Sequence, residues 1–360
     1  MKSSVVCREI NIVGPENQNK KKLTLIRNKK GLSLLITAAS PKNRSRNPCK
    51  EANSNTHYTP VLHHLQGAFK PRFMGLKTLQ MEEEKMNITP MEKRIQIVNA
   101  LVEGCSVRST ARMVGVEHKT VLRTLLRAGT ICARLLDERI QRIQARFVEV
   151  DEIWTYVFKK EQRLEDGDDP AERGDQYVFV GIESDTKLVI SHCIGKRDGR
   201  TALTLIDDLR SRITSRVQLT TDGFRAYLLA VETVFGADVD YAQLVKVYGS
   251  TRGEGEGPAW YGPAEVIETT PTVITGQPIP SRISTSYIER SNLTMRMMMR
   301  RFTRLTNAFS KKLENLRAQV ALHFAHYNFV RIHQTLRCTP AMEAGITDHV
   351  WGMEELLGCN

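Results

Sequence analysis

The feature that most constrains the fold is a run of strand-like segments in the middle of the chain that continues into alternating helices and strands. The three strand-like segments are followed by a helix, a strand and a helix, over residues 147–158, 177–182, 187–194, 201–213, 217–221 and 227–235. The first three are rich in β-branched and aromatic residues, and Ser184-Asp185 marks the turn of a predicted hairpin. This order predicts one mixed α/β sheet rather than separate all-α and all-β parts.

An all-α helix-turn-helix domain is predicted before the sheet, over residues 86–140. Its three helices are expected to run from Pro90 to Gly104, over 107–114, and from about Glu117 to Gly129. Ser106 can cap the second helix, and Gly115 provides the tight turn before the third. A helix, a short glycine-containing turn and a second helix form the arrangement with which many proteins enter the major groove of DNA.

The third of these helices carries a polar stripe at helical spacing. The stripe consists of Thr120, Arg123, Thr124 and Arg127, with Lys119 at its edge. Arginine suits guanine edges and phosphates, and threonine suits phosphates or a thymine methyl group, so these residues are predicted to bind DNA. An ordinary solvated helix shows the same pattern, and the stripe alone does not separate the two interpretations.

The net positive charge of the chain belongs entirely to its first 80 residues. They carry 15 Lys and Arg against 3 Asp and Glu, which equals the net charge of +12 of the whole chain. We interpret residues 1–85 as a basic, disordered extension. Three alternatives stay open: an arm that touches the DNA backbone, a solvated tail, or upstream sequence included by an early start codon, with Met81, Met86 or Met91 as the actual start.

The rest of the chain is predicted to hold an α/β domain over residues 145–340 and a tail over 341–360. Glycines and prolines between residues 236 and 283 indicate an insertion with one or two short strands. The seven cysteines are scattered without a CxxC pair, which argues against a zinc ribbon and a disulfide framework and favours the cytoplasm. No apolar run is long enough to span a bilayer, so no membrane partner is expected.

Three carboxylates are candidates for a metal site. Asp151 interrupts a strand that otherwise reads as buried, Asp222 follows the strand 217–221, and Glu289 lies near the start of a predicted helix over 284–305. Buried charges need a partner, and convergent carboxylates suit two Mg²⁺ (or Mn²⁺) ions that activate a water or 3′-hydroxyl for attack on a phosphodiester.

Each carboxylate also has a simpler interpretation. Asp222 precedes Gly223 in a common turn pair, and Glu289 fits a capping box with Ser286. Glu149 or Glu152 can compete with Asp151. If the helix is continuous, however, Glu289 shares a face with Arg296, Arg300 and Arg304, which are predicted to hold a DNA backbone beside the metal site.

Several long motifs, in the same order, resemble the DDE-class transposases of bacterial insertion sequences, nearest to the group named after the first-described insertion sequence. The resemblance runs from about Met86 to the C-terminus. The motifs are Val150-Asp151-Glu152-Ile153-Trp154, Thr220-Thr221-Asp222-Gly223, Ser284-Thr285-Ser286-Tyr287-Ile288-Glu289-Arg290, Arg300-Arg301-Phe302-Thr303-Arg304-Leu305-Thr306-Asn307, and His326-Tyr327-Asn328 through Arg331-Ile332-His333 to Thr339-Pro340.

The resemblance implies a ribonuclease-H-like catalytic domain with Asp151, Asp222 and Glu289 as catalytic, metal-binding residues. It also implies a homo-oligomer, associated with the nucleoid, that binds the terminal inverted repeats of its own element, cuts there and joins the 3′ ends to target DNA. The cysteine zinc finger that members of this group often carry has no counterpart in residues 1–90. Two alternatives stay open: a ribonuclease-H-like nuclease without joining activity, and a non-catalytic DNA-binding regulator.

Overall fold

The computed structural model describes residues 7–12, 21–28, 31–38, 89–249, 265–303 and 306–358, which fall into two compact units, Met1–Ala68 and Phe69–Asn360. In the first unit, β1 (Cys7–Ile12), β2 (Lys21–Asn28) and β3 (Gly31–Ala38) form an antiparallel sheet in that order. The sequence predicted no regular element in this segment. The remainder of the predicted basic extension lies outside the described residues.

The second unit is built on a mixed sheet, as the sequence predicted, and this sheet has six strands. Its strand order is β6-β5-β4-β7-β8-β9. The strands are β4 (Phe147–Val157), β5 (Gly174–Glu183), β6 (Val189–Gly195), β7 (Gln218–Thr221), β8 (Asp240–Gly249) and β9 (Glu265–Thr275). The central strand β4 pairs antiparallel with β5 and parallel with β7, and β7 in turn pairs parallel with β8.

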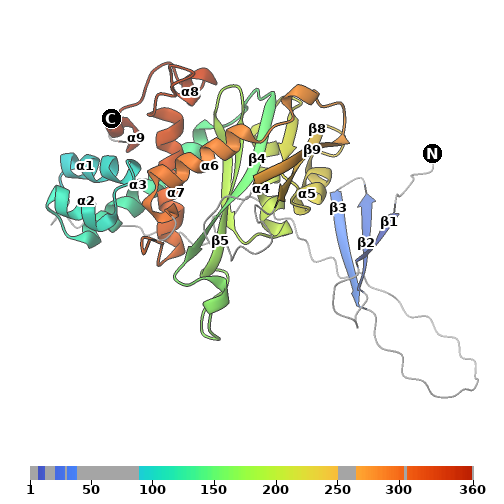
Figure 1. Ribbon diagram of the computed structural model, residues 1–360, viewed down its shortest axis with the longest axis horizontal. Coiled ribbons are helices and arrows are strands. Elements are labelled where there is room, and N and C mark those ends of the chain that lie inside the picture. Colours follow the sequence, from blue (N-terminus) through green and yellow to red (C-terminus); the bar gives the residue numbers. More distant parts are fainter. Residues whose placement is uncertain are drawn as a thin grey trace, which may run out of the picture. The chain divides into compact units, whose positions relative to one another are not determined.

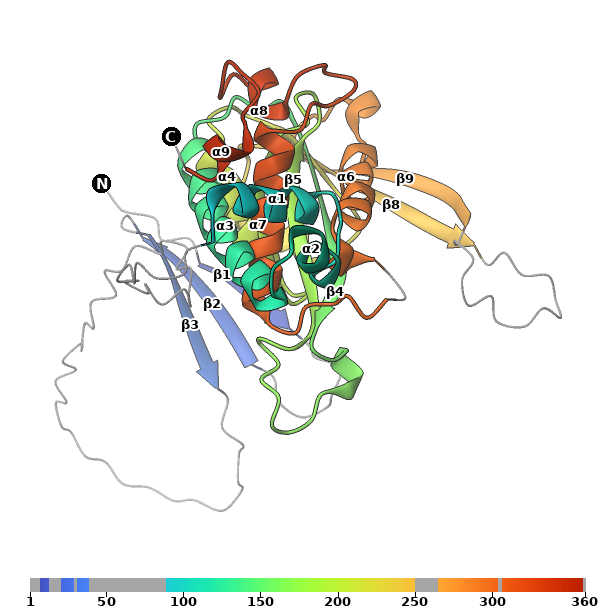
Figure 2. The same cartoon turned by 90° about the vertical axis from the view of Figure 1, so that its left-hand side faces the viewer.

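Helices cover both faces of this sheet (Figures 1 and 2). The long helices are α4 (Gly199–Arg212) and α5 (Ala226–Val234) on one face, and α6 (Ser286–Met298) and α7 (Leu313–Phe329) on the other. The short elements are η1 (Glu161–Arg163), η2 (Pro280–Arg282), η3 (Arg300–Phe302), α8 (Pro340–Glu343) and α9 (Met353–Leu356). The predicted insertion supplies β8 and β9, which extend away from the helices in Figure 2.

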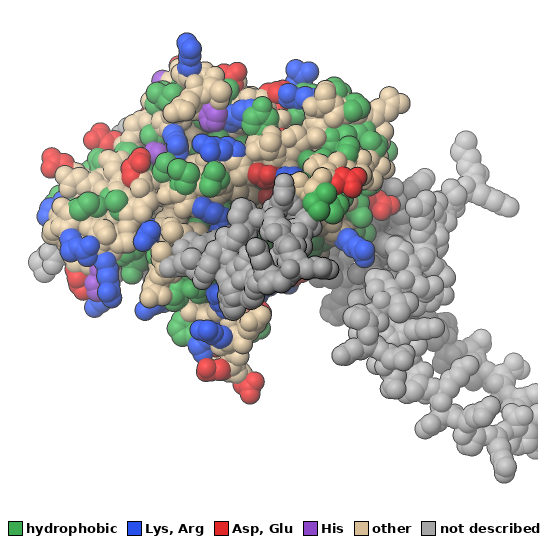
Figure 3. All heavy atoms as spheres, in the orientation of Figure 1, with side chains coloured by type: hydrophobic (Ala, Val, Ile, Leu, Met, Phe, Trp, Pro, Cys, Tyr) green, Lys and Arg blue, Asp and Glu red, His purple; other side chains and the backbone are tan. Residues whose placement is uncertain are grey.

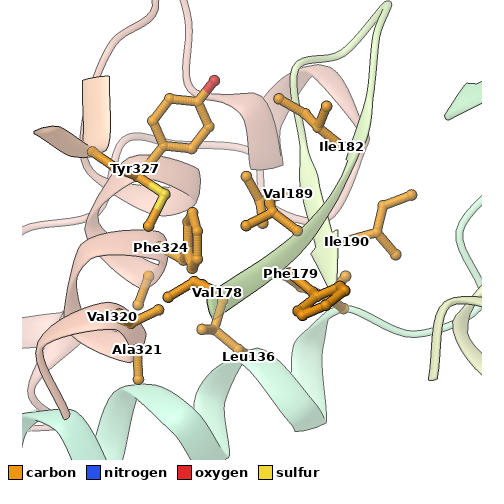
Figure 4. Close-up of a cluster of buried hydrophobic side chains, with 14 of the residues drawn as sticks. Leu136, Val178, Phe179, Ile182, Val189, Ile190, Val320, Ala321, Phe324 and Tyr327 are labelled. Carbon is orange, nitrogen blue, oxygen red and sulfur yellow. The ribbon is translucent and has the colours of Figure 1, made fainter. Parts of the chain in front are cut away.

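The core between α7 and the sheet consists of apolar side chains from β5, β6 and α7. Figure 4 shows Val178 of β5 and Val189 of β6 beside Val320 and Phe324 of α7. Asn328 adds a polar contact, because its side-chain amide both donates to and accepts from the backbone of Val189. Within the described part of the chain, no helix is long and apolar enough to cross a membrane.

Within the described residues, three helices precede the sheet, and each begins close to the position that the sequence predicted. They are α1 (Met91–Val102), α2 (Val107–Val114) and α3 (His118–Arg139). Ser106 caps α2 by accepting a hydrogen bond from the Ser109 N–H at 3.0 Å. Gly115 has a φ of +67°, a left-handed conformation that glycine adopts without a steric penalty and that turns the chain into α3.

The prediction that Gly129 ends α3 is wrong, because the helix continues ten residues further, to Arg139. The glycine instead allows α3 and α7 to approach closely. A Cβ atom at this position would lie 2.4 Å from the Cα of Ala318 in α7. Beyond it, Arg212 of α4 donates to the carbonyls of Leu136 and Ile140 and so satisfies the C-terminal end of α3.

We expect Gly129→Ala to lower the free energy of unfolding by about 3 kcal/mol, because the backbones of α3 and α7 cannot move apart to admit a methyl group. Urea denaturation of the full-length chain measures the change. Gly199→Ala is the matched control, since Gly199 opens α4 and a Cβ there meets nothing within 4 Å. A Gly129→Ala protein as stable as the control would contradict the proposed close helix contact.

Candidate active site

Asp151 lies in the middle of the central strand β4. Its Oδ1 accepts the backbone N–H of Glu152 at 2.8 Å, and its Oδ2 accepts the Nδ2–H of Asn292 in α6 at 2.9 Å. Burial raises the pKa of Asp151 to about 7, and the neighbouring charges of Glu152, Asp222 and Glu289 add to the rise. Two hydrogen bonds therefore do not compensate the negative charge that this carboxylate would carry at neutral pH.

Asp222 is brought beside Asp151 by strand pairing. Strand β7 ends at Thr221, which pairs in register with Val150 of β4, so the next residue on each strand lies at the same level of the sheet. Asp222 Oδ1 accepts the Phe224 N–H at 3.0 Å. Burial is the main cause that raises the pKa of Asp222 above its usual range. A second partly buried carboxylate thus joins the first.

Glu289 lies in the first turn of α6, which crosses the sheet beside β4 (Figure 1). Its Oε1 accepts a hydrogen bond from Thr285 Oγ1 at 2.7 Å and forms an ion pair with Lys246 of β8. The interpretation that Glu289 forms a capping box with Ser286 is wrong. The N–H groups of Tyr287 and Ile288 in the first turn of α6 donate to Glu149 of β4 instead.

The three predicted carboxylates line one cavity of about 640 Å³. We call it the carboxylate groove, and its lining includes Asp151, Asp222, Glu289, Arg197, Lys246 and Thr285. A smaller adjoining cavity of about 270 Å³ is lined by Asp151 and Glu289 together with Asn292 and Arg296. Elements that are far apart in the sequence therefore bring these carboxylates to a common opening.

Glu152 is closer to the two aspartates than Glu289 is. Asp151, Glu152 and Asp222 can offer ligand oxygens that all lie within 4.8 Å of one another. Both Glu152 oxygens already have partners, however, because Oε1 pairs with Arg197 Nε and Oε2 accepts the Tyr227 hydroxyl at 3.0 Å. Its side chain is only 3% exposed, whereas that of Glu289 is 47% exposed. These differences favour Glu289 as the third ligand that can reach a bound ion.

The donor set suits a hard divalent cation. Mg²⁺ and Mn²⁺ prefer carboxylate oxygens and leave positions open for water and phosphate. Burial raises the pKa of Asp151 and Asp222, with a smaller contribution from neighbouring carboxylates, and a bound divalent cation would stabilise their ionised forms. The residues present therefore fit a Mg²⁺ or Mn²⁺ site.

The predicted DNA contacts on α3 are mostly accessible. Lys119, Arg123 and Arg127 are exposed, and Thr120 is half-buried. Thr124 is an exception, because only 8% of it is exposed. Thr124 therefore points toward the core and is not available to bind DNA, unlike the other residues of the predicted stripe.

The predicted single row from Glu289 to Arg304 is wrong, because α6 ends at Met298 and Met299 is extended. Arg296 remains on α6 and lines the smaller cavity beside Glu289. Arg300 belongs to η3 and is exposed, but no longer follows the same helical face. Arg304 lies outside the described residues.

Four residues of the site had no predicted role. They are Asn292, Arg197, Tyr227 and Lys246, which contact Asp151, Glu152 or Glu289. Their partners are between 43 and 141 residues away in the sequence, so no local sequence pattern predicts these contacts. Arg197 also lies over the ring of Phe224, 4.2 Å from its centroid, which fixes its guanidinium at the edge of the carboxylate groove.

No protein-family model and no curated protein matches the chain. Thirteen chains of solved structures match it. A Mos1 transposase paired-end complex with left transposon end is 18% identical, with a TM-score of 0.18, over 43% of this chain and 60% of that chain. A piggyBac transposase synaptic complex with hairpin DNA is 11% identical, with a TM-score of 0.34, over 77% and 73%. The function is therefore inferred from the side chains of the carboxylate groove.

Proposed function

We propose that the chain is a metal-dependent DNA transposase of the DDE class, with a ribonuclease-H-like catalytic domain over residues 145–340. The observation that carries the proposal is the convergence of Asp151, Asp222 and Glu289 on one groove, where burial raises the pKa of both aspartates. Bound there, one or two Mg²⁺ or Mn²⁺ ions would activate a water or 3′-hydroxyl and stabilise the leaving oxygen of a phosphodiester.

The protein's own groups would position the DNA. Arg197 and Lys246 place positive charge at the edge of the carboxylate groove, where the phosphate backbone must approach. Arg197 is held by Glu152 and Phe224, so its guanidinium needs little ordering to meet a phosphate. Lys246 holds Glu289 at this edge through their ion pair.

We further propose that α2 and α3 form the helix-turn-helix that recognises the terminal inverted repeats of the element. Arg123 and Arg127 would reach base edges or phosphates from the exposed side of α3. On the face shown in Figure 3, Lys and Arg side chains are scattered rather than gathered in one patch. Affinity for DNA is therefore expected to depend on local contacts, in a homo-oligomer that pairs two ends at the nucleoid.

The test uses duplexes that carry the inverted repeats flanking the gene, with one 3′ end already cut and a supercoiled plasmid as target. Full-length protein with Mg²⁺ is expected to join the cut end to the plasmid, and EDTA is expected to abolish joining. Hydrolysis without joining would favour the nuclease alternative. Binding of the repeats that is insensitive to Mg²⁺, with neither cleavage nor joining, would favour a regulator and contradict the proposal.

A further inference from the structure

The buried carboxylate of Glu149 connects the central strand to the helix that carries Glu289. Glu149 of β4 is 3% exposed, and its Oε2 accepts the N–H groups of both Tyr287 and Ile288 at 2.9 Å. These are first-turn N–H groups of α6, which have no partner inside the helix. The cap residue Thr285 forms no capping bond to them within the described part of the chain. The helix is therefore capped from another strand, 138 residues away.

The environment of Glu149 acts on its charge in two directions. Burial raises the pKa of Glu149 to about 7, while the N–H groups of Ile288 and Tyr287 and the charge of Lys187 act to lower it. The contact with α6 therefore rests on the acceptor oxygen of Glu149, which a carboxyl group supplies in either protonation state.

A second contact joins the same two elements one turn further along α6. Asn292 donates its Nδ2–H to Asp151 Oδ2 at 2.9 Å, and the residue is 9% exposed. Its Oδ1 has no hydrogen-bond partner in the described structure. An unsatisfied buried acceptor is costly, so the orientation of the amide is set by its bond to Asp151 rather than by its own hydrogen-bonding needs.

The two contacts between β4 and α6 lie next to the proposed functional carboxylates Asp151 and Glu289. Glu149 and Asp151 are two residues apart on β4 and share a face of the sheet, while Glu289 and Asn292 are three residues apart on α6 and share a face of the helix. We propose that Glu149 and Asn292 are positioning residues, which hold α6 against β4 and thereby set the distance between Glu289 and Asp151. Neither needs to touch DNA or the bound cation.

The inference rests on the proposed function for its catalytic consequence but not for its metal-binding consequence. Titration of the full-length chain with Mn²⁺, followed by electron paramagnetic resonance of the free ion, measures cation affinity without DNA. We expect Glu149→Ala to weaken Mn²⁺ binding about 10- to 100-fold, as changes behind metal ligands typically do. Glu149→Gln keeps an acceptor for both N–H groups and should recover most of this loss.

Glu183→Ala is the matched control. Glu183 is also 3% exposed and also accepts backbone N–H groups, those of Asp185 and Thr186 in the β5–β6 turn and that of Phe147 at the start of β4, none of which belongs to α6. Its loss should lower the melting temperature without changing Mn²⁺ affinity. Equal weakening of Mn²⁺ binding by Glu149→Ala and Glu183→Ala would overturn the proposal, because general destabilisation would then explain both.

Asn292→Ala provides an independent measurement if Glu149→Ala does not fold. It should weaken Mn²⁺ binding about 10-fold, and in the joining assay it should lower kcat while the Kd for the repeats changes less than about twofold. Unchanged Mn²⁺ affinity would overturn the role of Asn292. If wild-type protein binds Mn²⁺ but never joins DNA, the proposed function fails, and the positioning role is still judged by the Mn²⁺ affinities.

Discussion

Asp151→Asn is expected to reduce Mg²⁺-dependent cleavage and joining by at least about 1,000-fold. Asparagine has the same shape and can still accept the Asn292 N–H, but it lacks the charge that holds a cation. Binding of the repeats should change little, because Asp151 lies in the groove and not on α3. Rates on a pre-cut end and gel-shift affinities measure the two properties separately.

The same substitution should stabilise the metal-free protein at alkaline pH. The pKa of Asp151 is about 7 in the folded chain against 3.8 for an isolated side chain, so the folded state binds a proton more tightly than the unfolded state. Below pH 4 the residue is protonated in both states and contributes no difference. As the pH rises from about 4 to about 7, the wild-type protein loses stability, by at most about 4 kcal/mol.

Urea denaturation in EDTA at pH 5 and pH 8 tests this dependence. Asp151→Asn should be more stable than wild type at pH 8, and the gain should shrink toward acid pH. Asp240→Asn is a control of opposite sign, because Arg216 lowers the pKa of Asp240 and its carboxylate therefore stabilises the fold above that pKa. An active Asp151→Asn protein, or one that gains no stability at pH 8, would refute the assigned role.

Glu289→Gln and Glu152→Gln are expected to behave differently. Glu289→Gln should lose cleavage and joining by about 1,000-fold with a melting temperature near that of wild type, since Glu289 is 47% exposed. Glu152→Gln should lose much less activity and cost little stability, because burial raises the pKa of Glu152 and the amide oxygen can still accept the Tyr227 hydroxyl.

The comparison decides which third carboxylate completes the site. Both variants are assayed on the same pre-cut end, with rates normalised to the folded fraction. The reverse outcome, an inactive but stable Glu152→Gln beside an active Glu289→Gln, would assign the site to Asp151, Glu152 and Asp222, the set whose oxygens lie closest together.

The positions of the site residues could be predicted from the sequence where local pattern determines them. Asp151 interrupts an apolar strand, and Asp222 follows a short buried one, so strand pairing alone brings them together. Ser106 and Gly115 likewise fix the boundaries of α2 through capping and a left-handed turn. These features depend on neighbouring residues, which a sequence displays directly.

Long-range packing could not be predicted in the same way. Gly129 reads as a helix end, yet its lack of a side chain is used to admit α7, 189 residues away in the sequence. The capping-box interpretation of Glu289 places the cap of α6 within its own helix, whereas Glu149 of β4 provides it. Met299 is apolar like Met295 one turn earlier, so no local signal in the sequence marks the end of α6.

The continuous helix α3 has a mechanical consequence for the proposed reaction. It is about 33 Å long at 1.5 Å per residue, with the predicted DNA-contacting side chains on its first half and α7 and Arg212 packed on its second half. A helix anchored in this way cannot rotate independently of the sheet. The number of base pairs between the recognised sequence and the scissile bond should therefore be constant, and lengthening that spacer by half a helical turn should misalign the bond.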